Sequence, residues 1–143
     1  MRRALPFLLL CPLLTGCGLL RPKPPEYPPV ELEGGLVVQD LVIPDDGPEA
    51  RHGDHVTIAY SIALAGDGTM VDSSDERGQP FRFRLEEGAV FPGLERGLLG
   101  MRLKGRRRIL VPSDLGYGSL GAPPRIPPDA DLDIKVELME LER

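Results

Sequence analysis

Alternation of apolar and polar residues is the dominant pattern along the chain. In residues 55–64 the apolar side chains at positions 56, 58, 60, 62 and 64 fall on one face, as in a half-buried strand. A second predicted strand, residues 132–141, repeats this pattern up to position 138, with charged residues at positions 133, 135 and 137. Shorter runs at 36–43, 70–73, 81–85 and 106–111 also have strand character. The pattern predicts a mostly antiparallel sheet.

One segment has a helical period instead. Leu94, Leu98 and Met101 follow an i, i+4, i+7 spacing, which predicts a short helix over residues 93–99. Gly100 is placed to end it in a left-handed conformation. Apolar positions such as Phe83, Leu98 and Val136 are predicted core residues. A sheet with a single short helix across it predicts an α+β fold.

The N-terminus has the layout of a signal peptide. A basic start at residues 1–3 precedes an apolar run at 4–14, which is shorter than the ~20 residues that a membrane span needs. The residues Leu-Thr-Gly-Cys at 14–17 resemble the bacterial lipoprotein box, and that resemblance implies a lipid on Cys17 as the first mature residue. Gly18 resembles the residue found there in lipoproteins sent to an outer membrane. An ordinary secretory signal with an incidental cysteine is the alternative.

A proline-rich segment follows at residues 21–29. Its composition favours an extended polyproline II spacer of about 3.1 Å per residue, and a proline-motif ligand for a recognition module is the alternative. The predicted organisation is therefore a signal peptide (1–16), a lipidated tether (17–35) and a folded domain (36–143). We expect a lipid-anchored protein on the periplasmic side of a bacterial cell envelope, in the outer membrane where one exists.

The composition argues against several kinds of partner and site. The formal net charge of −5 argues against nucleic acid as a partner. Cys11 and Cys17 are the only cysteines, which excludes a disulfide framework or a zinc site in the folded body. His52 and His55 have no third ligand nearby in sequence and are interpreted as residues of a solvated turn. We predict neither a metal nor a cofactor.

Two further motifs have structural interpretations. Residues 116–121 match the dinucleotide pattern GxGxxG, but Ala-Pro-Pro follows where that motif requires a helix. Arg106, Arg107 and Arg108 lie in a predicted strand, so the middle side chain faces away from the outer two. Pairing with acidic residues across strands is the preferred interpretation over an anion site.

From about residue 36 to 142 the chain resembles the FKBP-type peptidyl-prolyl cis-trans isomerases, the family that binds the macrolide tacrolimus. The match rests on motifs in order: Val71-Asp-Ser-Ser74, Pro80-Phe-x-Phe83, Val90-Phe-Pro-Gly93, Gly97-Leu-Leu-Gly-Met101, Tyr117-Gly118 and Ile126-Pro-Pro128. The resemblance implies a twisted antiparallel half-barrel sheet wrapped around one short helix. It also implies an apolar pocket that binds a proline ring of a polypeptide substrate.

Site residues follow from the same resemblance, position by position. The implied pocket walls are Tyr60, Val71, Phe81, Val90, Phe91, Leu94, Ile126 and Ile134. The Tyr117 hydroxyl would donate to the substrate carbonyl, with the Phe91 N–H as a second donor. Asp72 would lie at the rim, paired with Arg77 and close to the Tyr60 hydroxyl. We expect Tyr117, Asp72, Tyr60 and Phe81 to be the catalytic set.

Three positions depart from the best-known family members. Leu94 replaces a tryptophan at the pocket floor, and Val71 and Ile134 each replace a phenylalanine. We expect a wider pocket, weaker macrolide binding and a slower reaction. A non-catalytic module that binds proline-containing or apolar segments is the alternative function.

Overall fold

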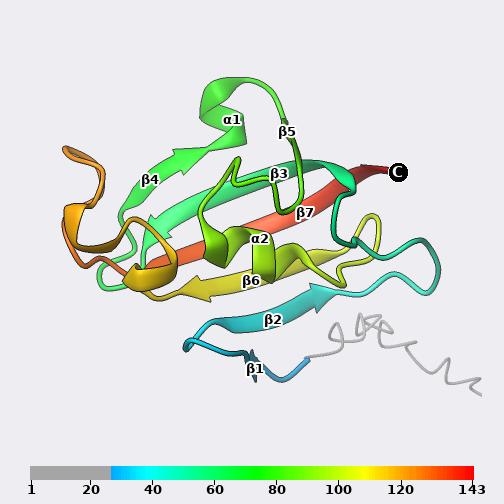
Figure 1. The fold of residues 1–143 in the computed structure, drawn as a ribbon, viewed down its shortest axis with the longest axis horizontal. Helices are drawn as coiled ribbons and strands as arrows, with labels where there is room; N and C mark the ends of the chain where they lie inside the picture. The colour runs from blue at the N-terminus through cyan, green and yellow to red at the C-terminus, as the bar shows by residue number, and fades with distance from the viewer. Residues whose placement is uncertain (1–26) are drawn as a thin grey trace, which may run out of the picture.

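The computed structural model describes residues 27–143, which form one seven-stranded antiparallel sheet with a short helix across it (Figure 1). The strands are β1 (Val30–Glu31), β2 (Val37–Val42), β3 (His55–Leu64), β4 (Met70–Ser73), β5 (Phe81–Arg84), β6 (Arg106–Val111) and β7 (Leu132–Glu142). Their order in the sheet is β1-β2-β6-β7-β3-β4. Strand β4 pairs with the C-terminal half of β3, and β5 pairs with its N-terminal half. The predicted α+β half-barrel fold and its six strands are confirmed.

Helix α2 (Pro92–Leu98) crosses one face of the sheet in front of β6 and β7 (Figure 1). Pro92 suits the first turn, where a backbone N–H has no partner within the helix. A Cβ at Gly93 would lie 2.3 Å from Val111 Cγ1, so the glycine permits close packing on β6. The three predicted helix-face residues are all buried, at positions 94, 98 and 101. Gly100 has the expected positive φ of 76°.

The core lies between α2 and the long strands β3 and β7. These two strands pair along their whole lengths, and a bulge falls where Thr57 pairs with Glu140 and Ile58 with Leu138. The bulge moves the alternation by one residue, so Leu141 rather than Glu140 returns to the apolar side. Phe83, Leu98 and Val136 are buried as predicted.

Helix α1 (Ser74–Arg77) was not predicted, because a single turn has no apolar period. Its ends have typical capping residues: the Ser73 hydroxyl accepts from the Glu76 N–H, and Gly78 adopts φ 75°. The buried Ser74 hydroxyl accepts from the Tyr60 N–H at 3.1 Å, which holds α1 against β3. The turn therefore starts from a fixed place at the end of β4.

The described residues include only the end of the predicted N-terminal segments. Val30–Glu31 fall within the segment predicted as a tether, yet they pair with β2 as strand β1. The predicted signal peptide and Cys17 lie outside the described residues. Within residues 27–143, no helix is long and apolar enough to cross a membrane.

The structural interpretations of the arginine run and the GxGxxG match are confirmed. Arg106 pairs with Glu137, Arg107 with Asp40 and Arg108 with Asp133, as expected for cross-strand ion pairs. The glycine motif lies in a loop with two short 3-10 helices, η1 (Ser113–Leu115) and η2 (Gly118–Leu120), and strand β7 follows without an intervening α-helix. His52 and His55 are both exposed.

Candidate active site

A cavity of about 540 Å³ opens between the sheet, helix α2 and the loop that precedes it. Aromatic and aliphatic side chains form most of its wall, and two charged residues lie among them. The lining residues are Tyr60, Ile62, Asp72, Arg77, Phe81, Gly88, Ala89, Val90, Phe91, Pro92, Leu94, Gly116 and Tyr117. A concave apolar site with a few polar groups is the usual form of a small-ligand pocket.

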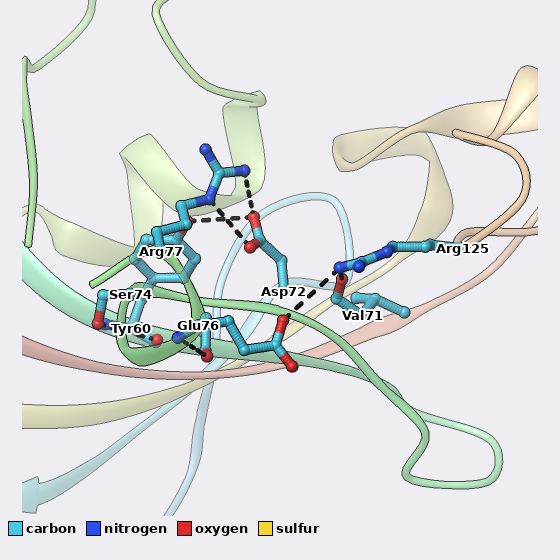
Figure 2. Close-up of polar contacts among 8 residues, drawn as sticks. Tyr60, Val71, Asp72, Ser74, Glu76, Arg77 and Arg125 are labelled. Atoms are coloured by element: carbon cyan, nitrogen blue, oxygen red, sulfur yellow. Dashed lines mark hydrogen bonds and ion pairs between the residues drawn. The ribbon is translucent and has the colours of Figure 1, made fainter. Parts of the chain in front are cut away.

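The negatively charged group in the pocket is the Asp72 carboxylate, whose two oxygens both accept hydrogen bonds (Figure 2). Arg77 donates from Nε to Oδ1 at 3.0 Å and from its terminal nitrogen to Oδ2 at 2.6 Å. The Tyr60 hydroxyl donates to Oδ2 at 3.1 Å. A five-residue extended segment would carry Arg77 roughly 16 Å away, so the turn of α1 is what brings the guanidinium back to Asp72.

These contacts set the protonation states at the rim. The Arg77 hydrogen bond lowers the pKa of Asp72 from its ordinary 3.8, and the Tyr60 hydrogen bond adds to that effect. Burial raises the pKa of Tyr60 above 10.0, and the bond to Asp72 adds to it. At neutral pH the carboxylate is therefore ionised and Tyr60 keeps its proton.

The lowered pKa of Asp72 predicts a pH-dependent stability. A carboxyl with a lower pKa in the folded state stabilises that state above its unfolded pKa, and loses this effect as the pH falls through 3.8 and below. Chemical denaturation of wild type and Asp72→Asn at pH 7 and pH 3 checks this. The free-energy gap between the two proteins should be larger at pH 7. An equal gap at both pH values would show that the Arg77–Asp72 pair does not stabilise the fold.

Aromatic rings form two opposite walls of the pocket. Phe81 meets Tyr60 edge-on with ring centres 6.4 Å apart and stacks on the buried Phe83 at 5.2 Å. On the other side, the Phe91 and Tyr117 rings lie 5.3 Å apart at 52°. The first pair is anchored in the sheet, and the second joins the start of α2 to the loop after β6. Contact between aromatic rings limits the motion of each wall.

Two hydrogen-bond donors are available to a ligand at the second wall. The Tyr117 side chain lines the cavity and the residue is 40% exposed. Phe91 precedes α2, and within residues 27–143 no hydrogen-bond acceptor is found for its backbone N–H. A bound carbonyl oxygen could accept a hydrogen bond from either group without breaking a hydrogen bond within the protein.

The structure divides the predicted site residues into two groups. Eight line the cavity together: Tyr60, Asp72, Arg77, Phe81, Val90, Phe91, Leu94 and Tyr117. Val71, Ile126 and Ile134 are not among the residues that line it and are buried in the core, so their place in the pocket wall stays a prediction. Ile62 does line the cavity and was missed, although its place two residues after Tyr60 on one strand face could have indicated it.

This arrangement suits binding and orientation. No serine, cysteine or histidine is among the residues that line the cavity, and the one carboxylate already has three hydrogen bonds. No group of three or more potential metal ligands occurs within residues 27–143. What the pocket offers a ligand is an apolar wall, two free donors and a fixed charge at the rim.

Comparison with known proteins agrees with the geometry. The sequence model of the FKBP-type peptidyl-prolyl cis-trans isomerases matches residues 47–139. The isomerase FKBP2 of Mus musculus is 46% identical over 95 residues, which cover 66% of this chain and 67% of that protein. The isomerase FPR2 of Saccharomyces cerevisiae is 39% identical over 116 residues, covering 78% and 82% of the two chains.

Two solved structures are similar to this chain in both fold and sequence. The crystal structure of AtFKBP13 has a TM-score of 0.73 and 31% identity, over 79% of this chain and 98% of that one. FkpA from Escherichia coli has a TM-score of 0.71 and 34% identity, over 80% of this chain and 51% of that one. The family match spans more than half of the chain and includes every strand that lines the pocket. The chain therefore belongs to the FKBP-type peptidyl-prolyl cis-trans isomerases.

Proposed function

We propose that this isomerase acts on proline-containing segments of unfolded polypeptides, and that it does so by desolvation and hydrogen bonding in the pocket around Phe81, Phe91 and Leu94. The observation that carries the proposal is the composition of this cavity: an apolar wall beside an unengaged backbone N–H and a tyrosine hydroxyl. The proline ring would enter the cavity, and the preceding carbonyl would accept from Tyr117 or Phe91.

The chemistry of the X-Pro bond explains why such a site suffices. Resonance gives the C–N bond double-bond character, so rotation has a barrier of ~18–20 kcal/mol. The twisted transition state has lost that resonance and has less charge separation than the planar amide. Transfer from water to an apolar wall therefore favours the twisted form. A millionfold acceleration requires about 8 kcal/mol of such differential stabilisation.

Asp72 has a supporting role in this proposal. Its carboxylate is held by Arg77 and Tyr60, and its pKa is lowered, so it does not exchange protons near neutral pH. The fixed negative charge lies at the pocket rim, where it can interact with the carbonyl carbon of a twisted amide. Asp72→Ala should lower the rate, and the rate should not vary between pH 6 and pH 8.

The departure at Leu94 has a testable effect on ligand binding. Of the three positions where an aliphatic residue replaces a family aromatic, Leu94 alone lines the cavity. We expect Leu94→Trp to fill part of the 540 Å³ cavity and to strengthen tacrolimus binding roughly tenfold, since the added ring buries more apolar area. Titration calorimetry of both proteins measures this, with Leu94→Met as the matched control. Unchanged affinity would show that the floor does not limit macrolide binding.

We also propose that the enzyme is tethered to a membrane of the cell envelope through a lipid on Cys17. The support is the sequence alone: a signal-like start, the Leu-Thr-Gly-Cys motif and a proline-rich spacer before the folded domain. Cell fractionation of wild type and Cys17→Ser tests it. Wild type should sediment with membranes and the variant should be soluble. Wild type in the soluble fraction would contradict the tether and leave the isomerase assignment unaffected.

A further inference from the structure

Arg125 bridges two parts of the chain that lie far apart in the sequence (Figure 2). It lies in the turn closed by the Ala122–Ile126 bridge, in the loop between β6 and β7. From there its guanidinium donates to the Val71 carbonyl on β4 at 2.8 Å. The same nitrogen lies 3.6 Å from the Glu76 carboxylate on α1.

The two parts that Arg125 connects hold opposite polar groups of the pocket. Tyr117 belongs to the loop after β6, whereas Asp72 and Arg77 belong to the β4–α1 segment. Val71 directly precedes Asp72, and Glu76 directly precedes Arg77. Arg125 therefore contacts the residue that directly precedes each member of the Asp72–Arg77 ion pair, through the Val71 backbone and the Glu76 side chain.

The loop between Tyr117 and Arg125 is tightly folded, so a restraint at one end acts on the other. The Gly121 N–H donates to the Tyr117 carbonyl at 3.2 Å, and the Asp129 N–H donates to the Gly118 carbonyl at 3.0 Å. A Cβ on Gly121 would lie only 2.5 Å from the Ile126 carbonyl oxygen. Close backbone packing of this kind leaves little room for Tyr117 to move independently of Arg125.

Of the two contacts, the hydrogen bond to Val71 provides the restraint. The Glu76 pair is exposed on both sides, and exposed ion pairs add little. The Val71 carbonyl is fixed instead, because its residue is buried in the core and lies within strand β4. A charged donor on a fixed carbonyl is a short and directional contact.

We propose that Arg125 is a positioning residue that holds the Tyr117 loop at a set distance from the Asp72 wall. This inference rests on the proposed role of Tyr117 as the hydrogen-bond donor to the substrate. The guanidinium itself does not line the cavity. Arg125 therefore affects the reaction by fixing the position of the Tyr117 hydroxyl.

A double-mutant cycle on activity tests the inference, because a residue that acts through Tyr117 cannot matter once the hydroxyl is gone. The proteins are wild type, Arg125→Met, Tyr117→Phe and the double variant, with kcat/KM measured on one proline peptide. Arg125→Met should lower kcat/KM roughly fivefold to tenfold in the wild-type background. It should lower the value by less than about twofold in the Tyr117→Phe background.

Two further variants make the result specific. Arg106→Met removes another exposed ion-paired arginine, one that lies outside the pocket, and should leave kcat/KM within about twofold of wild type. Arg125→Lys keeps a cationic donor and should be intermediate between wild type and Arg125→Met. A Lys variant as slow as the Met variant would overturn the role of the hydrogen bond.

The cycle separates failure of this inference from failure of the proposed mechanism. If Tyr117→Phe slows the enzyme and Arg125→Met does not, or slows it by the same factor in both backgrounds, the positioning role of Arg125 is overturned alone. If Tyr117→Phe has no effect, the role of Tyr117 is overturned and this inference with it.

Discussion

Replacing Phe91 with alanine should reduce kcat/KM roughly a hundredfold, equivalent to about 2.7 kcal/mol of transition-state stabilisation. Phe91 contributes to the site in two ways. Its ring is part of the apolar wall, and it packs 5.3 Å from the Tyr117 ring. Without it, water would reach the amide, and Tyr117 would lose its aromatic neighbour. The backbone N–H stays in place, so the variant tests the wall and not the donor.

Stability has to be measured alongside, because a lost aromatic contact also affects folding. Phe91 is only partly buried, and the core contacts between α2 and β6, which include Leu98 and Ile109, are unchanged. Thermal unfolding should therefore show a folded protein at the assay temperature. Leu120→Ala is the matched control, since Leu120 is an exposed apolar residue that does not line the cavity. A folded Phe91→Ala protein with the wild-type rate would contradict the role of the wall.

Tyr117→Phe should lower kcat/KM roughly fivefold to tenfold, because a neutral hydrogen bond contributes about 1 to 1.4 kcal/mol. The change removes one oxygen and keeps the ring, so the contact with Phe91 and the loop remain. Tyr117 has no hydroxyl contact within residues 27–143 that the variant would break. The unfolding temperature should therefore stay within about 2 °C of wild type.

The control for Tyr117→Phe is Tyr27→Phe, the same chemical change at a residue outside the cavity. That variant should keep the wild-type rate on the same proline peptide. If Tyr117→Phe matched it, the substrate carbonyl would not depend on the Tyr117 hydroxyl. The Phe91 N–H would then be the remaining donor in the proposed site.

The local alternation of apolar and polar residues predicted most of the fold. The alternation at residues 55–64 and 132–141 is strong because both strands have one face on a continuous core. Two elements were missed for a shared reason: β1 has two residues and α1 has four, too few for a period to appear. Capping residues at Ser73 and Gly78 were the only local signals of α1.

The pocket could be predicted less well than the sheet. Pocket walls and core are both apolar and occur on the same strand faces, so sequence could not separate the lining Ile62 from the buried Ile134. Family resemblance supplied Tyr117, Asp72 and Arg77. The Arg125–Val71 contact spans 54 residues. It could not be predicted from the sequence, because nothing in a loop arginine indicates which distant carbonyl it reaches.

The central claim is that this pocket itself accelerates rotation of the X-Pro bond. It is tested most directly by the cis-to-trans relaxation of a proline peptide, measured with wild type and with the combined Phe91→Ala and Tyr117→Phe variant. The account predicts clear acceleration by wild type and a kcat/KM at least about a hundredfold lower for the folded double variant. No acceleration by wild type, or a double variant as fast as wild type, would contradict it.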